Sequence, residues 1–206
     1  MRRDNRLLSS DIAGALCDAV TADTGATAVF LNGALGAMVT PSRPYGTKGM
    51  APHRDRLLGL VREAETAARP LLAEPFTVRR TDVFLPVDNR GYHLSFQLGL
   101  FPRQLWQGHV RTTVGVFEIG PVRAASVPGE IEPNLAGRIK AQLGGAPSLV
   151  FALADDELGY LMAREDAQLP TFTYERTLTP CDDAGDRLSK AVLDLSRAGL
   201  ARPRVP

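Results

Sequence analysis

The sequence predicts a single α/β domain, with a mixed sheet and flanking helices. Segments with helical and strand-like patterns alternate along the chain, in the order αβαβββαβα. The chain has 206 residues, of which 44% are hydrophobic and 23% charged, which suits one domain with a substantial core. No internal repeat or linker divides it. Alternation of this kind places the helices against a sheet that is at least partly parallel.

The helices are predicted from apolar spacing and from residues typical of helix ends. Ser9, Ser10 or Asp11 can cap the first helix, which ends at Gly25. A proline at a first-turn position and apolar residues four apart predict a helix after Glu130. The four predicted helices span about 9–25, 54–69, 131–144 and 186–198.

The strands are predicted from short apolar runs rich in β-branched and aromatic residues, separated by turns. A glycine-rich loop, 33–49, follows the first of them. The five predicted strands span 27–32, 76–87, 92–101, 110–120 and 148–154.

Charge and cysteine content narrow the possible partners. Lys and Arg number 24 against 23 Asp and Glu, so nucleic acid and anionic membranes are not expected as partners. No apolar run is long enough to span a bilayer, and the N-terminal residues lack the apolar core of a signal peptide. Cys17 and Cys181 are far apart and fit a reducing compartment, so a cytoplasmic location is expected.

Three polar clusters follow the carboxyl ends of predicted strands: the Gly33–Thr40 loop, Glu130, and Asp155–Tyr160. Sites in open α/β sheets are usually built at this edge. Glu130 comes directly after a Pro-Gly turn and has two interpretations. It is either a helix-start residue that complements the helix dipole, or a metal ligand or catalytic base.

Other residues give weaker signals. The glycine loop lacks both phosphate-binding glycine patterns, so it is either a tight turn or a simple anion cradle. His53, His93 and His109 have no paired metal-binding spacing. At most two of the three adjacent acids at 155–157 can share one side of an extended segment. Tyr174, taken in isolation, is a half-buried packing residue.

Several segments, in order, resemble the neutral/alkaline non-lysosomal ceramidase family and its shorter bacterial relatives. The most specific parts are VPGE and the spacing from ELGY to YE. The matching segments are NRLLSSDIAG (5–14), VFLNGALGAMVTP (29–41), VGVFEIGPVRAASVPGE (114–130), VFALADDELGYL (150–161) and FTYERTLTP (172–180).

The resemblance implies hydrolysis of the amide bond of an N-acylsphingosine or a similar N-acyl lipid or amide. The family uses one zinc ion held by two histidines, a glutamate and a tyrosine. The matching motifs make Glu130 and Tyr174 zinc ligands and Tyr160 the residue that polarises the amide. Thr40 takes the place of a family serine, although Ala37 and Met38 stand where that loop has an aspartate.

The loop residues Asn32, Gly33 and Gly36 are expected to bind substrate.

The family's two zinc histidines precede the region that matches NRLLSSDIAG. The resemblance therefore implies that residues 1–206 correspond to the C-terminal portion of a ceramidase-like catalytic domain, with two of its four zinc ligands. Three explanations stay open: a truncated frame, a separate chain that supplies the histidines, or substitution by one of the three histidines present.

Two other functions stay open beside a zinc amidohydrolase: a non-catalytic binding relative, and an anion-binding protein that uses the glycine turn. Unpaired strand edges would favour a homo-oligomer.

Overall fold

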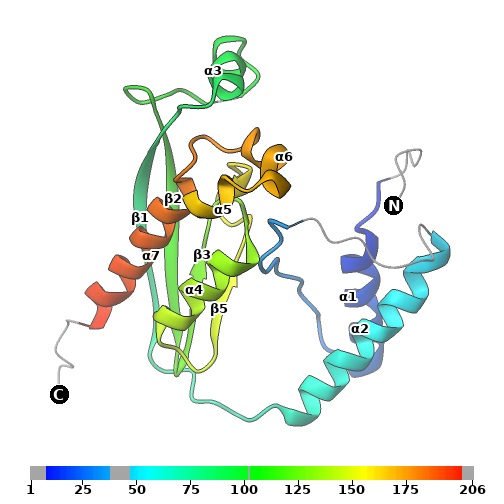
Figure 1. The fold of residues 1–206 in the computed structure, drawn as a ribbon. Coiled ribbons are helices and arrows are strands. Elements are labelled where there is room, and N and C mark those ends of the chain that lie inside the picture. The colour runs from blue at the N-terminus through cyan, green and yellow to red at the C-terminus, as the bar shows by residue number, and fades with distance from the viewer. Residues whose placement is uncertain (1–7, 38–46, 102, 201–206) are drawn as a thin grey trace. The chain divides into compact units, whose positions relative to one another are not determined.

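The computed structural model describes residues 8–37, 47–101 and 103–200 (Figure 1). Its contacts divide the chain into two compact units. The first is made of 1–31 and 39–70, and the second of 32–38 and 71–206. That the whole chain is one domain stays a prediction.

The first unit is a pair of helices, α1 (Asp11–Thr24) and α2 (Thr47–Ala67). Helix α1 ends at Gly25, whose φ of 72° is left-handed and whose N–H bonds to the carbonyl of Thr21. The Arg62 guanidinium binds both carboxylate oxygens of Asp23, at 2.6 and 2.7 Å, and joins the two helices.

The predicted strand at 27–32 is wrong, because residues 27–32 form no strand. Val29, Phe30 and Leu31 are between 50% and 78% exposed. β-Branched and aromatic residues favour a strand only where a neighbouring strand accepts their backbone hydrogen bonds and side chains.

The second unit contains a four-stranded mixed sheet in the order β1-β2-β3-β5. Strands β1 to β3 are antiparallel neighbours, and β3 and β5 are parallel. The predicted α/β class with a mixed sheet is therefore confirmed. The four strands are β1 (Phe76–Pro86), β2 (His109–Ile119), β3 (Val122–Ser126) and β5 (Ser148–Phe151).

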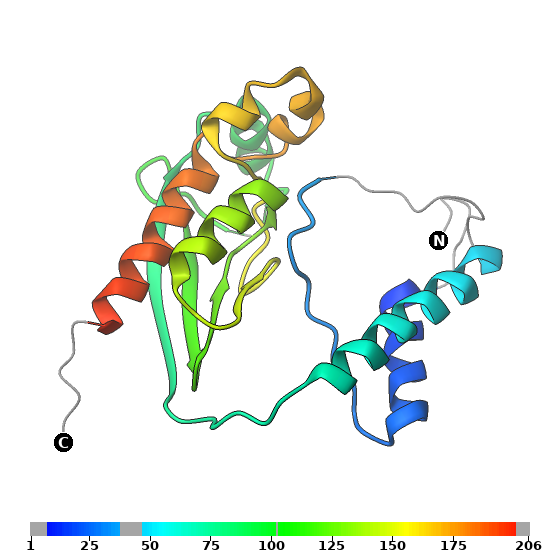
Figure 2. The ribbon, with the colours of Figure 1, turned by 60° about the horizontal axis from the view of Figure 1, so that its bottom comes forward.

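Helices α4 (Pro133–Leu143) and α7 (Ala184–Leu200) pack on one face of this sheet (Figures 1 and 2). Leu135, Ile139 and Leu188 are almost fully buried between helices and sheet. Side chains on the opposite face are more exposed, among them Phe76 at 66% and Val78 at 46%. A homo-oligomer stays a prediction.

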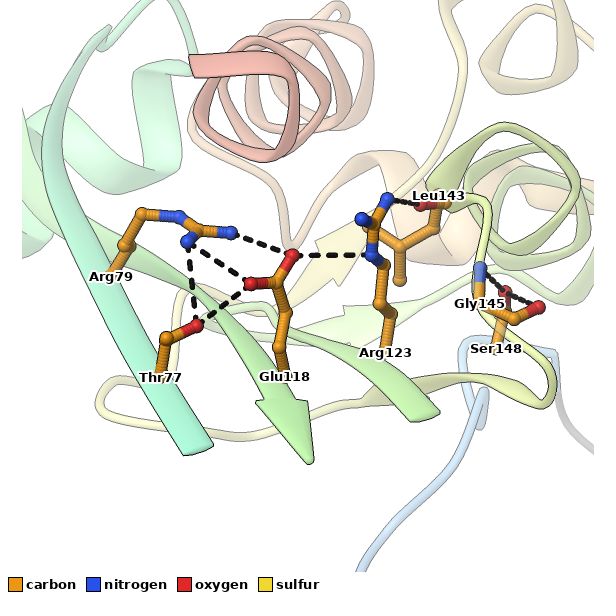
Figure 3. Close-up of polar contacts among 7 residues, drawn as sticks. All are labelled: Thr77, Arg79, Glu118, Arg123, Leu143, Gly145 and Ser148. Atoms are coloured by element: carbon orange, nitrogen blue, oxygen red, sulfur yellow. Dashed lines mark hydrogen bonds and ion pairs between the residues drawn. The ribbon is translucent and has the colours of Figure 1, made fainter. Parts of the chain in front are cut away.

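Figure 3 shows a polar network on the helix-covered face, centred on Glu118. The carboxylate of Glu118 accepts hydrogen bonds from Thr77 (2.8 Å) and Arg79 (3.2 Å) on β1. It also pairs with Arg123 on β3, at 3.1 Å. Arg123 in turn donates to the carbonyl of Leu143, at the C-terminus of α4. The network therefore joins three strands and one helix.

The predicted strand at 92–101 is also wrong, since Arg90–Gln97 form helix α3. The side chain of Asn89 accepts hydrogen bonds from the N–H groups of Gly91 and Tyr92 and caps the helix. The rings of Tyr92 and Phe96, one turn apart, each pack at a tilt against that of Phe101. The cap and this aromatic cluster outweigh the alternating apolar pattern.

The remaining elements are short and lie in the part of the chain that follows β3. They are β4 (Glu130–Ile131), β6 (Tyr160–Leu161), α5 (Arg164–Ala167), a 3-10 turn (Pro170–Phe172) and α6 (Thr173–Arg176). Across the described residues, no helix combines the length and apolarity needed to cross a membrane.

Candidate functional site

Glu130 and Tyr160 lie opposite one another on a two-stranded parallel sheet formed by β4 and β6. The N–H of Glu130 donates to the carbonyl of Gly159, at 2.8 Å. The N–H of Tyr160 donates to the carbonyl of Leu178, just after α6, at 3.0 Å. These two backbone bonds hold three separate segments of the chain side by side.

Tyr174, on α6, completes the cluster. Its ring meets that of Tyr160 edge-on, with centroids 6.2 Å apart and planes at 66°. Burial, and next the charge of Glu130, raises the pKa of the Tyr160 phenol. The structure thus brings together three predicted site residues that stand far apart in the sequence: a carboxylate and two phenols.

Glycines allow this close approach. A Cβ on Gly129 would lie 2.5 Å from the carbonyl oxygen of Gly159, and one on Gly159 would lie 1.9 Å from that of Leu178. Gly159 also has a φ of 76°, which side chains rarely tolerate. A Cβ on Gly36 would lie 2.3 Å from the carbonyl oxygen of Glu130. The absence of side chains at these positions lets the backbones that carry the site touch.

Glu132, two residues after Glu130, starts the following helix. Its side chain accepts a hydrogen bond from the N–H of Leu135, at 2.9 Å, and caps α4. The helix-start interpretation of Glu130 is therefore wrong. The side chain of Glu130 is half-buried and lies close enough to the Tyr160 phenol to raise the pKa of that phenol.

The three acids at 155–157 point to different partners. Asp155 pairs with Arg80 at 2.6 Å, and Asp156 pairs with Arg103 and accepts a hydrogen bond from Thr112. Glu157 accepts from the N–H of Gly159. Burial raises the pKa of Glu157, and the nearby charge of Glu130 adds to the rise. Glu157 is thus the one of the three acids whose hydrogen-bond donor, Gly159, directly precedes Tyr160.

The predicted substrate-binding loop reaches the site only in part. The N–H of Gly36 donates to the carbonyl of Ile131 at 2.8 Å, and the carbonyl of Asn32 accepts from Ala152 at 3.0 Å. Gly33 is exposed, and a Cβ there would meet nothing within 4 Å. Thr40 lies outside the described residues. Binding of substrate by these residues stays a prediction.

The donor set makes up only part of a zinc site. Zinc in proteins takes about four ligands, mostly imidazole, thiolate and carboxylate. In residues 8–37, 47–101 and 103–200, no three His, Cys, Asp or Glu side chains form a metal-binding group. Within the second unit, His93 lies on α3 and His109 at the start of β2, with Nδ1 2.9 Å from the carbonyl of Gln107. Glu130 and Tyr174 alone do not complete a zinc site.

One neighbour of the site, Tyr92, is not indicated by the sequence. The hydroxyl of Tyr92 donates to the carbonyl of Leu158, and burial raises the pKa of Tyr92 to about 12. The predicted strand at 92–101 gives no indication of this position, which depends on helix α3. Glu175, the neighbour of Tyr174 in the YE pair of the sequence, is buried.

The mixed sheet and its flanking helices form a ceramidase-like fold. The chain is similar, over its full length, to the crystal structure of neutral ceramidase from Pseudomonas aeruginosa, with a TM-score of 0.70 and 17% identity. It is also similar to a ceramidase complexed with C2, with a TM-score of 0.71 and 16% identity. The chain spans 43% and 44% of those chains, less than half their length.

No protein-family model and no curated protein matches the sequence. At this identity the likeness establishes the fold, and the resemblance drawn from the motifs is confirmed at that level.

Proposed function

We propose that this chain forms part of a ceramidase-like zinc amidohydrolase that cleaves the amide bond of an N-acylsphingosine or a similar N-acyl lipid. The observation that carries the proposal is that Glu130, Tyr160 and Tyr174 lie together in this fold. In this proposal Glu130 and Tyr174 hold the metal, and the remaining ligands come from a part of the fold outside this chain.

A bound zinc ion would polarise the amide carbonyl and lower the pKa of a water molecule. The chain's own residues would provide orientation. The short β4–β6 pair fixes Glu130 opposite Tyr160. The Tyr160 hydroxyl is a hydrogen-bond donor suited to the carbonyl oxygen as negative charge develops on it. Tyr174 is 57% exposed and is accessible to further ligands and to substrate.

Zinc titration by equilibrium dialysis tests the assignment. The wild-type chain should bind zinc saturably, and Glu130→Gln should abolish that binding. Glu165→Gln is a matched control, because Glu165 is an exposed glutamate of the same unit that pairs with Arg138. Equal zinc binding by wild type and Glu130→Gln would refute the role of Glu130.

The incomplete donor set favours a second candidate, a non-catalytic relative that keeps the fold as a binding module. It predicts that the chain binds N-acylsphingosine vesicles without binding zinc. It also predicts that Glu130→Gln leaves lipid binding unchanged. Zinc binding that depends on Glu130 would exclude this candidate.

A further inference from the structure

The turn that carries Tyr160 is held by a side chain from a helix far away in the sequence. The hydroxyl of Tyr92, on α3, donates to the carbonyl of Leu158, 66 residues further along the chain. The carbonyl of the next residue, Gly159, accepts from the N–H of Glu130 at 2.8 Å. The Tyr92 hydroxyl is therefore bonded to the same short turn that bonds to Glu130 and leads into Tyr160.

Helix α3 also holds the segment on the other side of Tyr160. The N–H of Tyr160 donates to the carbonyl of Leu178 at 3.0 Å. The side-chain amide of Asn89, the cap of α3, donates to the carbonyls of the residues before and after Leu178, at 3.0 and 2.9 Å. Tyr160 thus lies between two backbone segments, and each of them is bonded to a side chain from the start of α3.

The surroundings of Tyr92 fix the position of its hydroxyl. The ring of Tyr92 packs against that of Phe101, with centroids 5.2 Å apart, and Phe96 packs against Phe101 from the next turn of α3. A Cβ on Gly159 would lie 3.2 Å from the Tyr92 oxygen, so the phenol and the turn are in close contact. Burial raises the pKa of Tyr92 to about 12, so the hydroxyl keeps its proton and remains a donor at neutral pH.

Packing alone does not require the hydroxyl, because a phenylalanine would fill nearly the same space as Tyr92. The hydroxyl adds a hydrogen bond to one backbone atom, and a hydrogen bond is directional whereas apolar contact is not. Such restriction matters next to a site, because misplacement of a reacting group by about 1 Å can lower a rate by about 100-fold.

Resting on the proposed function, we propose that Tyr92 is a positioning residue for the pair formed by Glu130 and Tyr160. Its hydroxyl fixes the carbonyl of Leu158, and thereby the turn that carries Tyr160 and bonds to Glu130. Tyr92 acts through this backbone and takes no part in the chemistry itself.

Replacing Tyr92 by phenylalanine tests the proposal, because it removes the hydroxyl and keeps the ring. Ser95→Ala is the matched control, since it removes another hydroxyl of α3, one that donates to the carbonyl of Gly91 within the same helix at 2.8 Å. Amide hydrogen exchange followed by NMR should become about fivefold faster at Glu130 and Tyr160 in Tyr92→Phe, the effect of losing one ordinary hydrogen bond. Ser95→Ala should leave both amides unchanged.

The ring of Tyr160 gives a second readout, which a general loss of stability would not produce. Tyr160 and Tyr174 meet edge-on and should give a nuclear Overhauser effect between their rings. The pKa of Tyr160 is raised by burial, next by the charge of Glu130, and then by Tyr174 and Glu175. In Tyr92→Phe this ring signal should weaken and the pKa of Tyr160 should fall toward its ordinary value of 10.0. Circular dichroism and the exchange of the β1–β2 amides should stay unchanged.

Unchanged amide exchange at Glu130 and Tyr160, or an unchanged Tyr160 ring, in Tyr92→Phe would overturn the proposal. Equal acceleration of exchange across the β1–β2 ladder would also overturn it, because it marks a loss of global stability. Should Tyr92→Phe fail to fold, the wild-type chain still decides the matter. Its Tyr92 hydroxyl proton should exchange slowly and show a nuclear Overhauser effect to a Cα proton of Gly159, and rapid exchange would refute the bond.

Failure of the proposed function has a different signature. It would appear as the absence of zinc binding that depends on Glu130, and none of the measurements on Tyr92→Phe requires zinc.

Discussion

Replacing Gly36 by alanine should separate the glycine loop from the strand that carries Glu130. The added Cβ would lie 2.3 Å from the carbonyl oxygen of Glu130, and 2.6 Å from both the nitrogen of Glu132 and the carbonyl carbon of Ile131. All three are backbone atoms, so no side-chain rotation relieves the overlap. Ordinary contact begins near 3.4 Å, and one backbone must therefore move by about 1 Å.

Two effects set the expected loss of local stability in Gly36→Ala. Overpacking of this kind costs about 1–3 kcal/mol. Loss of the 2.8 Å hydrogen bond from Gly36 to Ile131 adds about 1 kcal/mol. We expect Gly36→Ala to lower the local stability of the loop and of β4 by about 2–4 kcal/mol.

Hydrogen exchange measured by mass spectrometry checks this expectation, read on peptides that cover 32–37 and 129–133. Gly33→Ala is the matched control, because its Cβ would meet nothing within 4 Å and its φ is not positive. Protection should fall in Gly36→Ala and stay unchanged in Gly33→Ala. Equal protection in the two variants would refute the close backbone approach.

Three further predictions concern the network, the α3 cap and the thiols. Hydrogen bonding from Arg79 is the main cause that lowers the pKa of Glu118. The charged carboxylate therefore stabilises the fold at pH values above 4.5, the ordinary pKa of the group. This stabilisation is lost as the pH falls below that value and the carboxylate is protonated. Glu118→Gln should lower the free energy of unfolding, measured in urea, by about 1–3 kcal/mol at pH 7 and by less near pH 3. An equal loss of stability at both pH values would contradict an electrostatic origin of the stabilisation. Asn89→Ala removes the N-terminal cap of α3 and the hydrogen bonds that the Asn89 amide donates to the carbonyls of Thr177 and Thr179. The free energy of unfolding should fall by about 2–3 kcal/mol, and circular dichroism should show a lower melting temperature. Cys181 is 2% exposed, with its pKa raised by burial to about 12, so a thiol reagent at pH 8 should modify the partly exposed Cys17 first; faster labelling of Cys181 would place it at the surface.

The sequence predicted the elements whose signals are local. Helix α4 has a proline at its start, apolar residues four apart and Gly144 at its end, and the structure confirms it. The segment 92–101 alternates apolar and polar residues, yet Asn89 and the aromatic contacts make it helical. The segment 27–32 has the composition of a strand but forms none. Periodicity is a property of one segment of the sequence, whereas a strand forms only where a second strand pairs with it.

Some features of the candidate site were predictable from the sequence, and others were not. Glu130, Tyr160 and Tyr174 were predicted from motifs, and the structure places them together. The unpaired oxygen of Glu175 was not predictable, because burial and missing partners are properties of the folded chain. The contact between Gly36 and Ile131 joins positions far apart in the sequence, and no spacing rule reports it.

The two-residue strands β4 and β6 also set the order in which this region can form. Each supplies only two residues to their shared ladder, so neither is stable until Gly36 and Leu178 add their backbone bonds from distant parts of the chain. Contacts between such remote segments form late, because each must first overcome the entropy of closing a long loop. The pairing of Glu130 with Tyr160 therefore reports completed folding of the second unit, and protection of their amides should be among the last acquired during refolding.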